Sequence, residues 1–463
     1  SLIRRIIANS SSTELTSSSH GSHSLRYSRF SSTVTKSSLA SPSIGASNSS
    51  PSSTINELEG RGGGESGSSG HPIGSGIKHR NEPGVLVVLI QRQRFKWTAS
   101  CEAMGGNGES GNWTYGDYLR LHELLELQGD GRGISADEMH FIIVHQTFEL
   151  WFKQIIRELS ETREILDQVP VPEDDIPRAV SHLERTTEIF RLMANQWTVL
   201  ETLTPQGFLA FRDGLGTASG FESFQMREFE ALLGLETEDR LFGMDPIKTF
   251  RKLSERGGKD EEVLKRLEEQ MQKSSLFESL IKWIERTPIM GSSFDDDDDK
   301  DVVRAYVEAH LESHLKMGQD ALERMSDLDT EGAERMRERI DSSHQSAVSF
   351  LIPDGEISRS RAGLLFIESY RELPLLTWPR KLIDAFVELE ESMAKWRHDH
   401  ARMVERIIGK RTGTGGTSGV DYLDATARYR IFKDLWEVRT ILVKPQNRPD
   451  LINAEFYGYT VDS

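Results

Sequence analysis

From residue 113 onward, apolar residues recur at intervals of three and four along most of the chain. This spacing places apolar side chains on one face of an α-helix, and no run alternates apolar and polar residues as a half-buried strand would. Prolines fall mostly between the periodic stretches, where helices are expected to end. The pattern predicts an all-α protein with helices over Leu119–Leu127, Met139–Leu159, Ile176–Leu203, Phe221–Leu233, Val302–Met325, Leu364–Tyr370, Ile383–Ile408 and Tyr422–Val443.

The stretch 255–345 differs from the other helical regions in its density of charge. Glu alternates there with Lys and Arg at helical spacing, around an acidic run at Asp295–Asp299. We predict long exposed helices joined by a solvated acidic loop, forming a charged helical insertion attached to the core. His310 and His314 lie on this stretch in the order His-Leu-Glu-Ser-His, which is not the zinc-protease order because Glu does not follow the first His directly. A surface helix is therefore predicted for these two histidines.

Residues 1–105 have a different composition, rich in Ser and Gly and without helical periodicity. Such a segment buries too little apolar surface to offset its chain entropy, so we predict a disordered leader followed by one folded domain over 106–463. The start of the leader contains Arg and Ser with Glu14 as its one acid, a composition typical of mitochondrial transit peptides. The predicted location is the cytoplasm, with the mitochondrion as the alternative if the leader is a genuine transit peptide.

The formal net charge of −17 limits the possible partners. An acidic chain is repelled by phosphate backbones and by anionic membrane surfaces, so neither nucleic acid nor membrane is predicted as a partner. The most apolar run, Val85–Ile90, is also too short to span a bilayer, which needs about 20 residues. The single cysteine, Cys101, excludes an intramolecular disulfide and a cysteine-based zinc or iron–sulfur site.

One histidine lies on an aromatic helix face. Phe141, His145, Phe148 and Phe152 are spaced so that their side chains share one side of the predicted helix. Two interpretations remain open for His145. It is either a core histidine bonded to a neighbouring carbonyl or a histidine in an apolar cavity that hydrogen-bonds a ligand.

A second histidine lies on an apolar face near the end of the helix predicted over Ile383–Ile408. His400 shares this face with Trp396 and Met403, whereas His398 lies about 160° away beside charged residues and should be exposed. A neutral imidazole between Trp and Met is suited to ligate haem iron. The alternative is a structural histidine of the core.

A glycine- and threonine-rich loop, Gly409–Gly419, follows this helix. A phosphate-binding loop would place Gly-Lys-Ser/Thr at the end of the glycine run and at the start of a helix, and that order is absent. We therefore exclude nucleotide binding. The loop is either a linker or a mobile lid that contacts substrate.

Four segments carry the most distinctive combinations of residues. They are Trp113–Leu119 (Trp-Thr-Tyr-Gly-Asp-Tyr-Leu), His145–Gln154, Leu200–Ser223, and Lys395–Leu423 with the loop Gly413–Gly419. In order and spacing, these segments resemble the haem-dependent tryptophan 2,3-dioxygenase family. The resemblance covers about 113–235 and 355–445, is loose over 255–345, and does not include residues 1–100.

The resemblance implies an all-α helical bundle enclosing a haem pocket, with one haem b per subunit that is active as Fe(II). The implied reaction opens the indole ring of L-tryptophan with O₂ to give N-formylkynurenine, the first step of tryptophan degradation by the kynurenine pathway. A homotetramer is implied as well, with Tyr115 and Tyr118 entering the active site of a neighbouring subunit.

The resemblance also implies a role for each site residue. His400 resembles the iron ligand, and His145 resembles the histidine that accepts the indole N–H hydrogen bond. Phe208 replaces a tyrosine that reaches the substrate carboxylate in some members, which leaves more of that binding to Arg212. The residues implied to contact substrate are Phe141, Arg212, Leu215 and Thr414, and those implied to contact haem besides His400 are Trp396, Ser219, Gly220, Arg227 and Tyr422.

Three other functions remain as alternatives. A haem-binding sensor without turnover would keep His400 and lose the substrate contacts, but Arg212 and Thr414 are both present. A helical scaffold without cofactor is what periodicity alone favours. A haem dioxygenase that accepts a broader set of indoles is the nearest enzymatic alternative.

Overall fold

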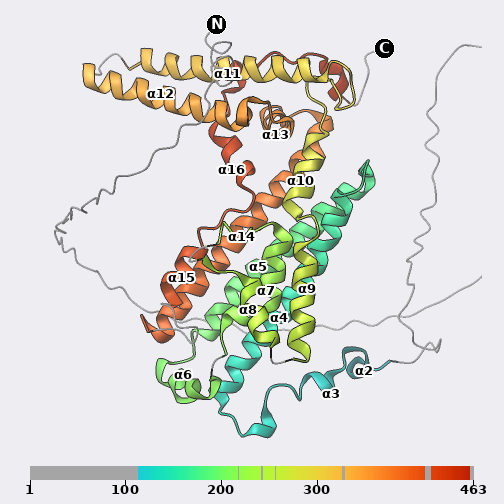
Figure 1. The fold of residues 1–463 in the computed structure, drawn as a ribbon, viewed down its shortest axis with the longest axis vertical. Helices are drawn as coiled ribbons and strands as arrows, with labels where there is room; N and C mark the ends of the chain where they lie inside the picture. The colour runs from blue at the N-terminus through green and yellow to red at the C-terminus, as the bar shows by residue number, and fades with distance from the viewer. Residues whose placement is uncertain are drawn as a thin grey trace, which may run out of the picture. The chain divides into compact units, whose positions relative to one another are not determined.

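The computed structural model describes residues 113–216, 218–240, 243–255, 257–325, 329–411 and 419–458. These residues form α- and 3₁₀-helices and no β-strand, apart from an isolated bridge between Ile289 and Ser292, so the all-α prediction is confirmed (Figure 1). The leader predicted over 1–105 lies outside them. Within the described ranges, no helix has both the length and the hydropathy that a membrane span requires.

Three long helices form the centre of the fold: α4 (Ala136–Leu166), α5 (Ile176–Leu200) and α14 (Thr377–Ile408). α5 packs along both α4 and α14, and Figure 1 shows the three side by side. Ser135 caps α4 by accepting the amide of Glu138, which satisfies a donor that the first turn leaves unpaired. The helices predicted at these positions are confirmed. Each begins at the first residue of the predicted range or a few residues before it.

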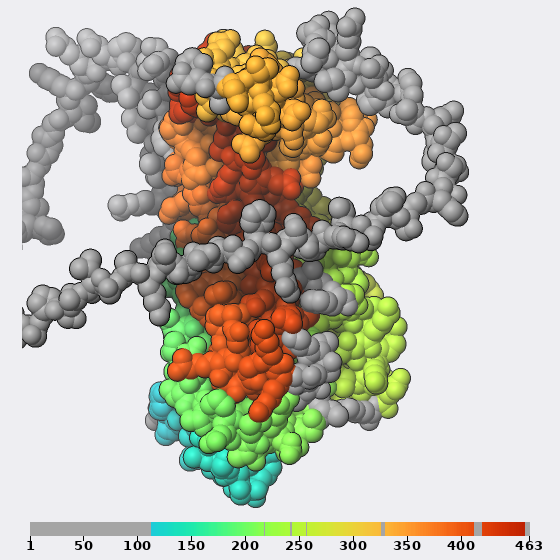
Figure 2. Space-filling view, turned by 90° about the vertical axis from the view of Figure 1, so that its left-hand side faces the viewer, coloured from blue at the N-terminus to red at the C-terminus, as the bar shows by residue number. Residues whose placement is uncertain are grey.

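The other helices lie outside this centre. The remaining α-helices are α2 (Tyr115–Leu119), α3 (Leu121–Leu124), α6 (Pro205–Arg212), α7 (Phe224–Leu233), α8 (Pro246–Ser254), α9 (Lys259–Met271), α10 (Leu276–Glu285), α11 (Asp299–Glu323), α12 (Thr330–Leu351), α13 (Arg359–Ser369), α15 (Gly419–Thr426) and α16 (Lys433–Thr440). The 3₁₀ turns are η1 (Asp130–Arg132), η2 (Glu173–Asp175), η3 (Asp213–Leu215), η4 (Gly220–Glu222), η6 (Pro353–Gly355), η7 (Pro374–Leu376), η8 (Pro445–Asn447) and η9 (Ala454–Tyr457). In Figures 1 and 2, α11 and α12 lie at one end of this folded part and α6 at the other.

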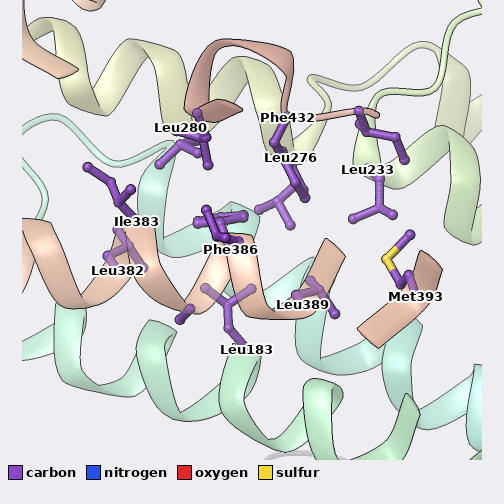
Figure 3. Packing of buried hydrophobic residues seen from close by; sticks show 14 of the residues in the cluster. Leu183, Leu233, Leu276, Leu280, Leu382, Ile383, Phe386, Leu389, Met393 and Phe432 are labelled. Carbon is purple, nitrogen blue, oxygen red and sulfur yellow. The ribbon is translucent and has the colours of Figure 1, made fainter. Parts of the chain in front are cut away.

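The core is continuous from α5 through α14 to α10 and the segment before α16. Leu183, Leu276, Phe386, Leu389 and Phe432 are fully buried and face one another (Figure 3). The rings of Phe386 and Phe432 meet edge to face, with centroids 5.0 Å apart. Each such side chain contributes about 1.5–3 kcal/mol on burial.

The helix predicted over Tyr422–Val443 is wrong as a single element, because the chain leaves helical conformation between α15 and α16. The cause is Glu390 of α14, a buried carboxylate that accepts the amides of Ile431 and Phe432 and the indole N–H of Trp436. These bonds replace the helical ones across the break. Similarly, Leu119–Leu127 is only partly helical, since Arg120 has a φ of 51° and separates α2 from α3.

The prediction of a surface helix for His310 and His314 is wrong. Both side chains are buried, His310 completely, because α11 packs one face against the rest of the fold. His310 Nε2 hydrogen-bonds the carbonyl of Ile441 at 3.0 Å. The acidic loop is only partly solvated as well, since Asp299 is buried and pairs with Arg359 at 2.7 Å.

The burial of His310 predicts a pH dependence of stability. Burial lowers the pKa of His310 from 6.5 to about 4, although its bond to Ile441 acts in the opposite direction. The unfolded chain therefore takes up a proton below pH 6.5 that the folded chain takes up only near pH 4, and stability falls as the pH falls through this window. Between pH 7 and pH 5 the wild type should lose about 2 kcal/mol from this group.

The measurement is urea unfolding at the two pH values. His310→Gln keeps a donor for Ile441 and should show a smaller loss than the wild type, whereas His398→Gln, at an exposed position, should match the wild type. An equal pH dependence in all three proteins would contradict this assignment.

A close helix crossing predicts a second effect on stability. A Cβ at Gly363 of α13 would lie 2.8 Å from the carbonyl oxygen of Ile284 in α10, and neither backbone can yield easily. Gly363→Ala should therefore lower the free energy of unfolding by about 1–3 kcal/mol. Gly131→Ala is the matched control, because a Cβ there meets nothing within 4 Å. Equal urea midpoints for the two variants would show that the crossing is not tight.

Candidate active site

A cavity of about 320 Å³ lies among α4, α6, α7, α14 and α15. Its size is typical of small-molecule sites. It brings together residues from segments far apart in the chain. The predicted site residues that line it are Phe141, His145, Arg212, Leu215, Ser219, Gly220, Arg227, Trp396, His400 and Tyr422.

Two predicted site residues are not part of this cavity wall. Tyr115 and Tyr118 are 76% and 75% exposed on α2. Thr414 lies outside the described residues. The cavity therefore contains the residues predicted from α4, α6, α7, α14 and α15, while those expected from a neighbouring subunit point to solvent in the single chain.

His145 has a defined hydrogen-bonding state. Its Nδ1 lies 2.8 Å from the carbonyl oxygen of Phe141, one turn earlier on α4. A carbonyl only accepts, so Nδ1 carries the proton and Nε2 is left as an acceptor. Burial lowers the pKa of His145, and the Phe141 carbonyl and Glu149 offset only part of this effect. The ring is therefore neutral at physiological pH. His145 is thus bonded to a neighbouring carbonyl and also lines the cavity, and its hydrogen bond to a ligand stays a prediction.

His400 lies on the face of α14 that lines the cavity. Its ring stacks on Trp197 of α5 with centroids 4.4 Å apart and planes within 2° of parallel. Burial, with a smaller contribution from the nearby His145, lowers the pKa of His400 to about 3. The imidazole is therefore neutral and able to ligate a metal. His398 is exposed, as predicted.

A buried ionic cluster borders the same cavity. Glu230 of α7 pairs with Arg227 at 2.9 Å, Arg240 at 2.5 Å and Arg397 at 3.1 Å. Burial would raise the pKa of Glu230, but the three guanidinium groups outweigh it and the pKa is lowered. Three cations share one carboxylate, so the cluster carries an excess of positive charge.

The cavity wall also contains unpaired donors. The indole nitrogens of Trp197 and Trp396 and Nε of Arg227 are buried without a hydrogen-bond partner in the described part of the chain. Buried donors are normally paired, and unpaired ones mark a place that a ligand can occupy. Combined with the cationic cluster and the neutral His400, they fit a planar metal-bearing group that also carries carboxylates, such as haem.

Part of the cavity wall is aromatic. Phe141, Phe208 and Leu215 form this part, and the ring of Phe141 lies 5.8 Å from that of Phe208. Thr204 caps α6 and Pro205 starts it, so α6 holds Phe208 and Arg212 on one short helix. An apolar wall beside one guanidinium suits an aromatic amino acid, whose ring packs and whose carboxylate pairs.

The sequence did not reveal several residues of the site. Glu149, Trp197, Glu230 and Arg397 line the cavity but were not predicted there. A signal existed for Glu230, because it lies three residues after Arg227 within an apolar stretch, where a buried charge requires a partner. Trp197 carried no signal beyond its position on the apolar face of α5.

The protein is thus an all-helical enzyme with a small-molecule site. That site combines two neutral histidines, an aromatic wall and a cationic border. The profile of the tryptophan 2,3-dioxygenase family matches residues 99–442. The chain therefore belongs to the tryptophan 2,3-dioxygenase family, a family of oxidoreductases. The matched range includes 255–345, the stretch whose motifs resemble the family only loosely.

Individual relatives agree with this membership. A tryptophan 2,3-dioxygenase of Sorangium cellulosum is 39% identical over 82% of this chain and 95% of its own length. Tryptophan 2,3-dioxygenase 2 of Ralstonia nicotianae is 40% identical over 76% of this chain and 98% of its own. A vertebrate relative, tryptophan 2,3-dioxygenase B of Danio rerio, is 33% identical over 76% of this chain and 88% of its own.

Proposed function

We propose that this chain is a haem-dependent dioxygenase that opens the indole ring of L-tryptophan to N-formylkynurenine, the first step of the kynurenine pathway. Membership of the family and the names of its relatives support tryptophan dioxygenation. The observation that carries the proposal is the single cavity lined by His145, His400 and Arg212, which come from three different helices.

The residues present fit haem b. His400 would ligate the iron through its neutral imidazole, and Trp396, Ser219, Gly220 and Tyr422 would border the macrocycle. The excess cations of the Glu230 cluster, led by Arg227, would pair with its carboxylates. When bound, ferrous haem supplies the activation of O₂ that a closed-shell indole needs.

The substrate would be oriented from both ends. Arg212 would pair with the carboxylate, a bond to a charged group worth about 1.5–3 kcal/mol. Phe141, Phe208 and Leu215 would pack on the indole ring and exclude water. His145 would accept the indole N–H through Nε2. This bond avoids the cost of about 1–3 kcal/mol for burying the indole N–H without an acceptor. His145 thus orients the indole, and attack at C2 or C3 does not require it to remove the proton first.

The same proposal extends to assembly and location. Tyr115 and Tyr118 are exposed beside Trp113 and Leu119, an apolar surface that suits contact with another chain. We infer a homotetramer in which these tyrosines complete a neighbour's site, and Thr414 touches the amino-acid head group. We also infer a cytoplasmic location, with mitochondrial import as the alternative that a reporter fused to residues 1–105 would reveal.

Mixing subunits tests the shared site. A Tyr115→Ala, Tyr118→Ala protein and a His400→Ala protein should each be inactive alone. Mixed under exchange conditions, they should recover part of the activity if each site takes its tyrosines from a neighbour. No recovery in a mixture that forms hybrid tetramers would contradict the arrangement.

The reaction itself is tested by titrating the anaerobic ferrous protein with L-tryptophan, admitting O₂ and following N-formylkynurenine. Bound haem without tryptophan consumption would favour a sensor. A protein that gains no Soret band on adding hemin would favour a scaffold. Comparable turnover of D-tryptophan or tryptamine would favour a dioxygenase of broader specificity.

Arg212→Ala should raise KM for L-tryptophan about 10- to 100-fold, because the variant loses a charged hydrogen-bond partner for the carboxylate. Haem loading should be unchanged. Tryptamine lacks the carboxylate and serves as the control, so its kinetics should change little. If tryptophan and tryptamine still differ in the variant as they do in the wild type, Arg212 does not bind the carboxylate.

A further inference from the structure

Glu149 lines the cavity but has no role in the proposed chemistry. It lies on α4 one helical turn after His145. Its Oε1 accepts the hydroxyl of Ser223 at 2.6 Å, and its Oε2 accepts the amide nitrogen of Gln225 at 2.9 Å. Both donors are neutral and come from a segment more than seventy residues away. The carboxylate therefore connects two distant parts of the chain.

The segment that Glu149 holds is the start of α7. Ser223 is the N-cap of that helix and also ends the turn η4, since its amide donates to the carbonyl of Gly220 at 3.3 Å. Its hydroxyl oxygen accepts from the amide of Met226 while its hydroxyl hydrogen goes to Glu149. One serine therefore fixes both the helix start and the turn, and Glu149 determines where that serine lies.

The turn in question forms part of the cavity wall. Ser219 and Gly220 line the cavity, and the hydroxyl oxygen of Ser219 accepts the amide of Phe221 at 3.3 Å. Gln225 adds a second attachment, because its Nε2 also donates to the main-chain carbonyl of Glu149 at 2.7 Å. The wall and the helix carrying His145 are thus joined at residue 149 by three hydrogen bonds.

The carboxylate also acts on His145 through its charge. Its negative charge opposes the effect of burial on the imidazole and so favours a more basic ring. A stronger base is a better acceptor for an indole N–H. Glu149 can thus affect the proposed reaction by position and by charge, and the two effects are separable by substitution.

We propose that Glu149 is a positioning residue that holds the turn Ser219–Ser223 in register with His145, so that both sides of the cavity present a fixed geometry to the substrate. This rests on the proposed function for its kinetic consequence. Its carboxylate is bonded to Ser223 and Gln225, and the proposed function assigns substrate binding to other residues, so its loss should lower kcat more than it raises KM.

A double-mutant cycle tests the proposal in the holoenzyme. Glu149→Ala and Ser223→Ala should each lower kcat about tenfold, and the double variant should be little worse than either, because both break the same connection. Glu149→Gln keeps an acceptor for Ser223 and should recover much of the loss, while its missing charge should shift the pH profile. Glu164→Ala, at an exposed position on the same helix, should match the wild type.

Hydrogen exchange gives a readout that does not depend on turnover. The amides of 219–226 should exchange faster in Glu149→Ala than in Glu164→Ala. The proposal would be overturned if the fold-losses in kcat of the two single variants multiplied in the double variant. It would also be overturned if Glu149→Ala changed neither the hydrogen exchange of these amides nor kcat. A wild type that binds haem but does not oxidise tryptophan would count against the proposed function instead, and the exchange experiment would still decide whether Glu149 holds the turn.

Discussion

His400→Ala should abolish the spectrum of histidine-ligated haem and lower tryptophan turnover by more than about a hundredfold, beyond the loss typical of residues that merely support a ligand. The physical reason is that His400 is the cavity histidine kept neutral by burial and held by a stacked tryptophan. Removing its ring leaves no imidazole on α14 to reach the cavity. The measurement is the Soret and visible spectrum of the ferrous protein, followed by turnover.

His398→Ala is the matched control, because it removes a histidine two residues away on the exposed face of the same helix. It should leave both spectrum and turnover as in the wild type. Added imidazole should restore part of the spectrum of His400→Ala by filling the space that the side chain leaves. A wild-type spectrum in His400→Ala without added imidazole would remove the ligand assignment.

Glu230→Gln should destabilise the folded protein by about 3–5 kcal/mol, the usual cost of removing one partner from a buried ionic group. Three buried guanidinium groups would lose the carboxylate that compensates them. The expected result is a large drop in the urea midpoint of the haem-free protein. Glu236→Gln, at an exposed position nearby, should leave the midpoint unchanged.

The same cluster predicts a pH effect of defined sign. The pKa of Glu230 is lowered in the folded state, so its contribution is present above the unfolded value of 4.5 and is lost as the pH falls below it. The difference in stability between wild type and Glu230→Gln should therefore shrink in acid. A difference that grows as the pH falls from 6 to 4 would contradict the role of the three arginines.

Much of the fold could be predicted from the sequence, because long helices repeat their apolar residues over many turns. α4, α5 and α14 lie where their periodicity indicated. The break between α15 and α16 could not be predicted, since it depends on Glu390 from a helix about forty residues earlier. Periodicity records the local pattern and contains no information about an acceptor supplied from elsewhere.

The site shows the same division. The aromatic face of His145 and the apolar face of His400 were visible in the sequence, and the structure places both on one cavity. Of the Glu230 cluster, only the spacing of Arg227 and Glu230 gave a signal in the sequence, because Arg240 and Arg397 join the cluster only in three dimensions. The exposure of His310 was predicted wrongly for a related reason. α11 carries many charged residues, and its buried face is too narrow to stand out in the sequence pattern.

The main-chain carbonyl of Phe141 determines which nitrogen of His145 carries the proton. Because the acceptor at Phe141 belongs to the peptide backbone, replacing that side chain changes the shape of the pocket wall without reversing which nitrogen is protonated. If His145 accepts the substrate N–H as proposed, the preference for a ring with an N–H over one with oxygen or sulfur at the same place follows from the main chain of α4. Evolution of the pocket lining can therefore alter size and fit while this chemical requirement persists.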